Sequence, residues 1–154
     1  VCDLKGYQKI SNQELLALDV DILVPAALEN VITMDNVEDV KAPIILEVVN
    51  GPVSHEAESA LLEKGTIIIP DVIANSGGVI VSYFEWVQNL SGDVWSLDKV
   101  NKKLSERIIF SFEQMLANTQ DDSLRASAYI LALKRIEEAV YAKGSEEYFS
   151  GESA

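Results

Sequence analysis

The sequence has few of the residues that build disulfides and metal centres. It contains one cysteine, Cys2, and one histidine, His55, among its 154 residues. A single cysteine excludes a disulfide within the chain, and one cysteine with one histidine is too few for a Cys/His zinc site. The composition therefore predicts a reducing compartment and no metal centre.

Long apolar segments are also missing. No apolar run approaches the roughly 20 residues that a membrane-spanning helix needs, and the first residues lack the apolar core of a signal peptide. We therefore expect no membrane partner and a cytoplasmic location. A mature protein of the mitochondrial matrix whose transit peptide had been removed would have the same composition.

Basic residues are scarce relative to acidic ones. Lysine and arginine together number 12, against 25 aspartate and glutamate residues, which gives a net charge of −13. A charge of this sign repels nucleic acid, so we expect no polynucleotide partner. An acidic, well-solvated surface is the simplest interpretation.

Three apolar runs have the pattern of buried β-strands. Residues 21–25, 43–49 and 66–70 are each nearly continuous in apolar side chains, as in strands that are covered on both faces. Segment 54–65, between the second and third runs, begins with a serine cap and ends with glycine, which predicts a helix. Strands that alternate with such helices pair in parallel, so the sequence predicts an α/β fold.

Helical signals surround these strands. Ser11 and Glu14 have the spacing of a capping box, which predicts the start of a short helix. After residue 90, apolar side chains recur every three or four positions and form one helical stripe, namely Val100, Leu104, Ile108, Phe112 and Met115. A second long helix is predicted from about residue 124 to residue 143, closed by Gly144. We expect an α/β region over 1–90, a helical pair over 91–144 that packs on it, and a loose acidic tail over 145–154.

Polar residues and glycines follow the second and third apolar runs. Asn50 and Gly51 come after the second run, and Asn75, Gly77 and Ser82 follow the third. Ligands of an open α/β sheet bind at the carboxyl ends of its strands, and asparagine amides both donate and accept hydrogen bonds. These positions predict a ligand site, although asparagines that only form turns beside glycine would have the same sequence.

Four segments of the chain resemble the glutamate dehydrogenase family of amino-acid dehydrogenases. They are ILVPAALEN at 22–30, NGP at 50–52, PDVIANSGGVIVSYFEWVQN at 70–89 and LRASAYI at 124–130. The resemblance implies the second half of a Rossmann-like parallel sheet followed by two long C-terminal helices. It also implies that the first βαβ unit and the N-terminal substrate domain of the family are missing, since no Gly-x-Gly-x-x-Gly turn is present.

The resemblance assigns roles to individual residues. The cofactor-binding residues that it implies are Asn50, Asn75, Gly51, Gly77, Ala26 and Asp3, and the substrate-binding residues are Ser82 and Val79. The catalytic lysine and acid of the family belong to the missing domain, so we expect no catalytic residue here and no activity of the isolated chain. Asp3 would accept hydrogen bonds from an unphosphorylated ribose, which favours NAD over NADP.

The implied reaction is the oxidative deamination of L-glutamate to 2-oxoglutarate and ammonia with NAD or NADP, in an enzyme that is commonly a hexamer. Ser82 and segment 85–89 favour glutamate, whereas a leucine, phenylalanine or valine dehydrogenase is the alternative within the family. A third hypothesis, from another class, is a noncatalytic module that binds nucleotide or docks on a full-length dehydrogenase.

Overall fold

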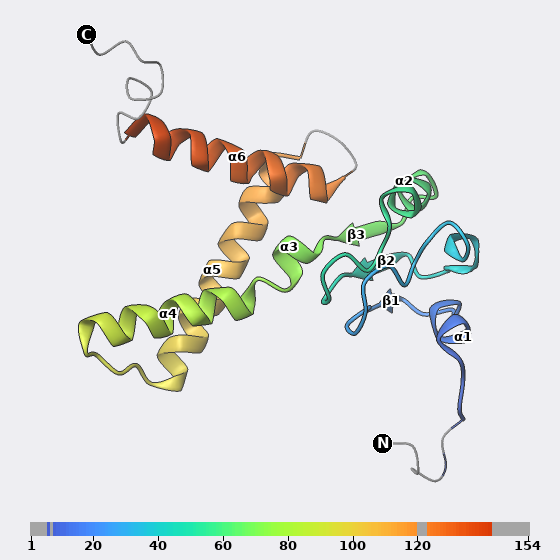
Figure 1. The fold of residues 1–154 in the computed structure, drawn as a ribbon, viewed down its shortest axis with the longest axis horizontal. Helices are drawn as coiled ribbons and strands as arrows, with labels where there is room; N and C mark the ends of the chain where they lie inside the picture. Colours follow the sequence, from blue (N-terminus) through green and yellow to red (C-terminus); the bar gives the residue numbers. More distant parts are fainter. Residues whose placement is uncertain (1–5, 7, 120–122, 143–154) are drawn as a thin grey trace. The chain divides into compact units, whose positions relative to one another are not determined.

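Two units make up the chain. The computed structural model describes residues 6, 8–119 and 123–142, and the units are Val1–Asp71 and Val72–Ala154. Figure 1 labels their helices and strands. The domain boundary that the sequence predicts at residue 90 stays a prediction, and the acidic tail over 145–154 lies outside the described residues. No helix among the described residues is long and apolar enough to cross a membrane.

The first unit contains the parallel sheet that the three apolar runs predict. Its strands, in sheet order, are β1 (Ile22–Leu23), β2 (Ile44–Leu46) and β3 (Ile67–Ile69). The strands are shorter than the apolar runs. Pro25 and Pro70 end two of those runs, and proline has no N–H with which to extend a strand ladder.

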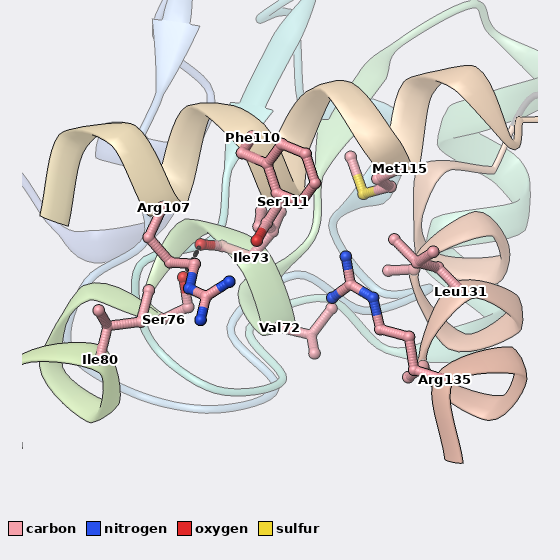
Figure 2. Close-up of a pocket in the computed structure, with 12 residues that line it drawn as sticks. Val72, Ile73, Ser76, Ile80, Arg107, Phe110, Ser111, Met115, Leu131 and Arg135 are labelled. Atoms are coloured by element: carbon pink, nitrogen blue, oxygen red, sulfur yellow. Dashed lines mark hydrogen bonds between the residues drawn. The ribbon is translucent and has the colours of Figure 1, made fainter. Parts of the chain in front are cut away.

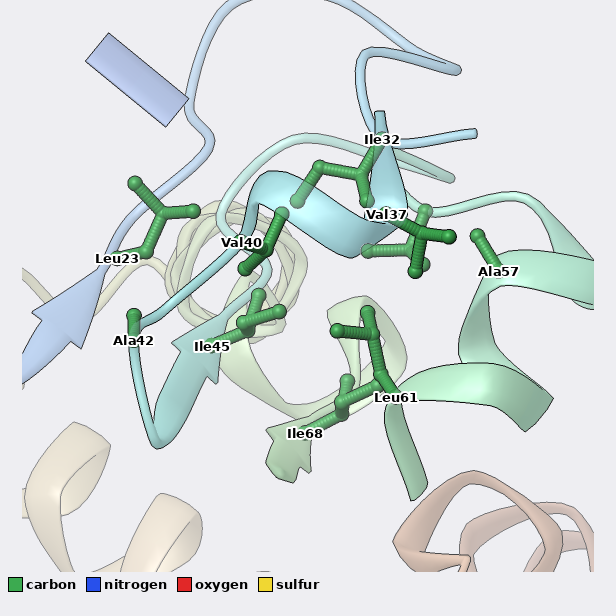
Figure 3. Close-up of a cluster of buried hydrophobic side chains, with 10 residues drawn as sticks. Leu23, Ile32, Val37, Val40, Ala42, Ile45, Ala57, Leu61 and Ile68 are labelled. Carbon is green, nitrogen blue, oxygen red and sulfur yellow. The ribbon is translucent and has the colours of Figure 1, made fainter. Parts of the chain in front are cut away.

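One hydrophobic cluster forms the core of the first unit, and Figure 3 shows its side chains. Ile45 of β2 and Leu61 of α2 (His55–Glu63) are completely buried. Val37, in the short 3-10 helix η1 (Val37–Asp39), and Ile32 are buried in the same cluster. α2 connects β2 to β3 and contacts both β3 and η1, so it is the crossover helix that the sequence predicts.

Side-chain caps define where the helices of this unit begin. In α1 (Asn12–Leu16), Glu14 Oε2 accepts a hydrogen bond from the Ser11 N–H at 2.7 Å, and Ser11 Oγ accepts one from the Glu14 N–H at 3.2 Å. This confirms the predicted capping box. The hydrogen bond from the Ser11 backbone is the main cause that lowers the pKa of Glu14 below its ordinary value, and a side-chain hydrogen bond with Ser11 adds to it. Ser54 caps α2 by accepting from the Ala57 N–H at 3.3 Å.

The chain from Val72 onward is helical. Its helices are α3 (Asp71–Ala74), which starts at the unit boundary, α4 (Gly77–Ser91), α5 (Leu97–Ala117) and α6 (Leu124–Ala142). α5 packs against both α4 and α6. In the predicted stripe of α5, Met115 is buried and the other four residues are half-buried. The glycine pair at 77 and 78 lies in the first turn of α4 and not in a turn before it.

Candidate functional site

The carboxyl ends of the three parallel strands meet at one edge of the sheet. Beyond β1, the Pro25 carbonyl oxygen accepts hydrogen bonds from the N–H groups of Val48 at 3.0 Å and Val49 at 3.1 Å. The Glu47 N–H donates to the Ile69 carbonyl oxygen of β3 at 3.1 Å. The segments that leave the three strands are therefore tied together, and this edge is where an open α/β sheet places its ligand.

Two carboxylates fix the loop that follows β2. Glu47 is completely buried, and its Oε2 accepts a hydrogen bond from the Asp71 N–H at 2.9 Å. Asp71 Oδ2 in turn accepts one from the Gly51 N–H at 2.9 Å. Hydrogen bonds to a charged acceptor contribute about 1.5–3 kcal/mol each. We call Glu47, Asp71 and Gly51 together the carboxylate relay. Their two hydrogen bonds link the loop after β2 to the start of α3.

Sequence reasoning gave no role to Glu47 or Asp71. The signal for Glu47 was present, since it is the one acidic residue within the apolar run 43–49. A charged residue is almost never fully buried unless it is paired, so its position in a predicted buried strand indicates a partner. No local pattern indicates which partner, because Asp71 lies 24 positions further along the chain.

The backbone at Gly51 has the geometry that a close ligand needs. Its φ of +56° is in the left-handed region, which glycine adopts readily. Apart from Gly51 itself and its two chain neighbours, no atom of the described residues lies within 4 Å of the place where a Cβ would stand. The Gly51 carbonyl oxygen accepts from the Asn30 N–H at 2.8 Å, so the turn is held on both sides. An open backbone position beside an exposed amide side chain, Asn50, fits a flat polar ring such as nicotinamide.

Ala26 lies at the same edge, in the segment that follows β1. It helps to line a cavity of about 310 Å³ whose other walls include Leu15 and Leu16 at the end of α1 and Leu23 of β1. The lining is mostly apolar. The structure thus brings Ala26, Asn50 and Gly51 to one edge of the sheet, as expected for residues that follow neighbouring parallel strands.

The other expected site residues lie on α4 or just before it. Asn75 is half-buried between α3 and α4, while Ser82 and Val79 are exposed on α4. A Cβ added to Gly77 would stand 3.7 Å from Ile108 Cδ1 of α5, which is an ordinary packing distance. Gly77 thus faces α5 at a distance that would accept a methyl group. The cofactor and substrate roles of these residues stay predictions.

Asp3, the residue expected to contact the ribose, lies outside the described residues. In the part of the chain that the structure describes, no group of three histidine, cysteine, aspartate or glutamate side chains is placed to hold a metal ion.

The sequence matches known amino-acid dehydrogenases. The family model described as Glutamate/Leucine/Phenylalanine/Valine dehydrogenase matches residues 1–144. The chain is 52% identical over 151 residues to the NADP-specific glutamate dehydrogenase of Synechocystis sp., covering 97% of this chain and 35% of that protein. It is 48% identical over 139 residues to the NAD-specific glutamate dehydrogenase of Staphylococcus aureus, covering 89% and 34%. The chain spans about a third of the length of these relatives.

Solved structures agree with the sequence matches. The hetero-hexameric glutamate dehydrogenase of Thermus thermophilus, in its Leu-bound form, has a TM-score of 0.83 and 31% identity over 90% of this chain and 34% of that chain. The glutamate dehydrogenase of Peptoniphilus asaccharolyticus has a TM-score of 0.75 and 38% identity over 79% of this chain and 31% of that chain.

Proposed function

Because the chain belongs to the Glutamate/Leucine/Phenylalanine/Valine dehydrogenase family, we propose that it is a section of an NAD(P)-dependent glutamate dehydrogenase. The observation that carries this proposal is the 52% identity to an NADP-specific glutamate dehydrogenase over 97% of the chain. The whole enzyme oxidatively deaminates L-glutamate to 2-oxoglutarate and ammonia. The chain alone has no activity, because the bond-making residues belong to the remaining two thirds of such an enzyme.

In this proposal the chain holds the nicotinamide and one part of the substrate. When it is bound, the cofactor accepts a hydride from the substrate α-carbon. The Asn50 and Asn75 amides bind the carboxamide and the ribose hydroxyls, and Gly51 lets the ring approach the backbone. Ser82 donates a hydrogen bond to a substrate carboxylate, and Val79 lines the space for the substrate side chain. The supporting observations are the open backbone at Gly51 and the exposure of Asn50, Ser82 and Val79.

The relatives support a proposal for the cofactor and for the assembly. One similar protein is NADP-specific and another is NAD-specific, so the cofactor is NAD or NADP, and Asp3 favours NAD. The similar protein from Thermus thermophilus is a hetero-hexamer. We propose a homo-hexamer located in the cytoplasm, in which the other part of the polypeptide supplies the substrate domain and the first half of the cofactor domain.

Steady-state kinetics of the intact native protein test the proposed reaction. L-Glutamate, L-leucine, L-phenylalanine and L-valine are each assayed with NAD and with NADP. We expect the highest kcat/KM with glutamate. A higher value with leucine, phenylalanine or valine would contradict glutamate as the substrate and identify the enzyme as a dehydrogenase for that amino acid. The absence of turnover with all four amino acids would favour the noncatalytic module.

A serine variant tests the part of the substrate site on this chain. We expect Ser82→Ala to raise the KM for glutamate about tenfold, which corresponds to the roughly 1.4 kcal/mol of one hydrogen bond to a charged group. The KM for leucine, which has no side-chain carboxylate, is expected to stay unchanged. Ser105→Ala on the exposed side of α5 is the matched control. Equal effects on glutamate and leucine would show that Ser82 does not bind the carboxylate.

A further inference from the structure

A cavity of about 540 Å³ lies among the helices of the second unit and belongs to none of the sites described above. α3, the start of α4, α5 and α6 all contribute to its lining. Figure 2 shows that Arg107 reaches into it from α5 and that Arg135 reaches into it from α6. Two basic side chains from different helices therefore converge on one space.

The two arginines have no partner of opposite charge in the part of the chain that the structure describes. The ion pairs in the described part of the chain join Lys64 to Glu38, Lys99 to Asp93 and Lys102 to Glu106. Among the described residues, neither Arg107 nor Arg135 takes part in an ion pair or a hydrogen bond. No aspartate or glutamate among the described residues lines the cavity. This is unusual in a chain with 25 acidic and 12 basic residues, because most surfaces of such a chain carry carboxylates.

Other groups around the cavity also suit an anion. Ser76, the residue that precedes the first turn of α4, lines it, so the positive end of the α4 dipole lies at its edge. Its Oγ donates its one hydrogen to the Ile73 carbonyl oxygen at 2.8 Å, so Ser76 contributes its place at the start of α4 and not a hydroxyl donor. Ser111 of α5 adds a hydroxyl to the lining. Hydroxyl and guanidinium groups donate hydrogen bonds to phosphate and carboxylate oxygens.

The remaining lining is apolar. Ile73, Phe110, Met115 and Leu131 surround the two arginines. A volume of about 540 Å³ is within the range of small-molecule sites, which are mostly apolar with a few polar groups that fix the orientation of the ligand. The lining thus combines an apolar wall with two cations. A bare inorganic ion would leave the apolar wall unused.

We propose that this cavity binds a small organic anion that has an apolar body and one phosphate or carboxylate group. The guanidinium groups of Arg107 and Arg135 hold the anionic group, and the apolar wall holds the rest of the molecule. Both arginines are exposed at the surface, so the ligand enters from solvent without any rearrangement of the helices. The site is distinct from the edge of the sheet where Asn50 and Gly51 lie.

Calorimetric titration of the intact native protein tests the proposal with three probes. Phenyl phosphate carries a ring and a phosphate, benzoate carries a ring and a carboxylate, and phenol carries the ring and no charge at neutral pH. We expect phenyl phosphate or benzoate to bind at least tenfold more tightly than phenol, and the stronger of the two identifies the anionic group. The titrations are repeated with saturating NADP. Probe binding that NADP abolishes is assigned to the cofactor site, and probe binding that persists is assigned to the cavity.

Arginine variants locate the binding. We expect Arg107→Gln and Arg135→Gln each to weaken binding of the anionic probe about tenfold or more, since a charge-assisted hydrogen bond is lost. Lys102→Gln on the same helix is the matched control, because Lys102 does not line the cavity. Wild-type affinity in both glutamine variants, or phenol binding as tightly as the anions, would overturn the proposal.

A second measurement on the wild-type protein does not depend on how well a variant folds. Phenylglyoxal modifies accessible arginines, and mass spectrometry gives the rate at each position. Phenyl phosphate or benzoate is expected to slow modification of Arg107 and Arg135 about tenfold. Unchanged rates of modification at both arginines would also overturn the proposal. This result is also expected if carboxylates from elsewhere in the polypeptide already fill the cavity.

Discussion

Replacing Asp71 by alanine is expected to release the loop after β2 without removing the other half of the carboxylate relay. The substitution deletes Oδ2, which accepts the Gly51 N–H at 2.9 Å, but it keeps the Asp71 N–H that donates to Glu47. A hydrogen bond to a charged group contributes about 1.5–3 kcal/mol. Because Asp71 is half-buried, the lower part of that range applies, about 1.5–2 kcal/mol. Asp71→Asn keeps an oxygen acceptor without the charge, so its cost is expected to be smaller, about 1 kcal/mol.

Hydrogen exchange at the Gly51 amide measures this loss directly. A change of about 1.5–2 kcal/mol makes the amide exchange roughly 10 to 30 times faster in Asp71→Ala, and Asp71→Asn is expected to give about a fivefold increase. Asp19→Ala is the matched control, since Asp19 is an exposed carboxylate in the same unit. If the Gly51 amide in Asp71→Ala exchanged within twofold of the wild-type rate, the Asp71 carboxylate would not hold the loop.

Three further substitutions test the fold and its electrostatics. Leu61→Ala removes a completely buried side chain from the core and is expected to lower the free energy of unfolding by about 2–5 kcal/mol, measured by urea denaturation; a loss below 1 kcal/mol would contradict the core assignment. Gly77→Ala is expected to leave the melting temperature unchanged or to raise it, because the new Cβ stands 3.7 Å from Ile108 and alanine favours the helix; a clear decrease would refute this packing. Ser11→Ala is expected to raise the NMR-measured pKa of Glu14 only in part, because the variant loses the Ser11 hydroxyl but keeps the Ser11 backbone N–H, which is the main cause of the lowered pKa. Since the folded pKa is depressed, the capping contribution is complete above the ordinary value and is lost as the pH falls through the folded pKa. A Glu14 pKa in Ser11→Ala that rose fully to its ordinary value would refute the Ser11 backbone hydrogen bond as the main cause.

The α/β architecture follows from local sequence signals. The apolar runs locate the three strands, and proline and glycine mark where the segments end, as Gly65 does with a φ of +83° after α2. The capping box at Ser11 and the stripe that ends at Met115 also depend on residues within a few positions of each other. Such short-range patterns can be recognised without knowing what packs against them.

The candidate site is less predictable because its contacts connect distant positions. Asn50 and Gly51 are recognisable as residues that follow a strand, but nothing local indicates that Asp71 holds them. Arg107 and Arg135 line the same cavity because α5 packs on α6. In the sequence, each arginine has the pattern of an ordinary charged residue on a helix.

The carboxylate relay sets an order of events during synthesis and folding. Gly51 leaves the ribosome 20 residues before Asp71, and Glu47 leaves it 24 residues before. The loop after β2 can therefore pair with Pro25 and Asn30 as soon as it is made, but its hydrogen bond to Asp71 forms only after β3 has been made. Contacts that form after the main barrier affect the unfolding rate and not the folding rate. The carboxylate relay thus joins this edge of the sheet only after β3 is in place, and we expect its loss to affect mainly the unfolding rate.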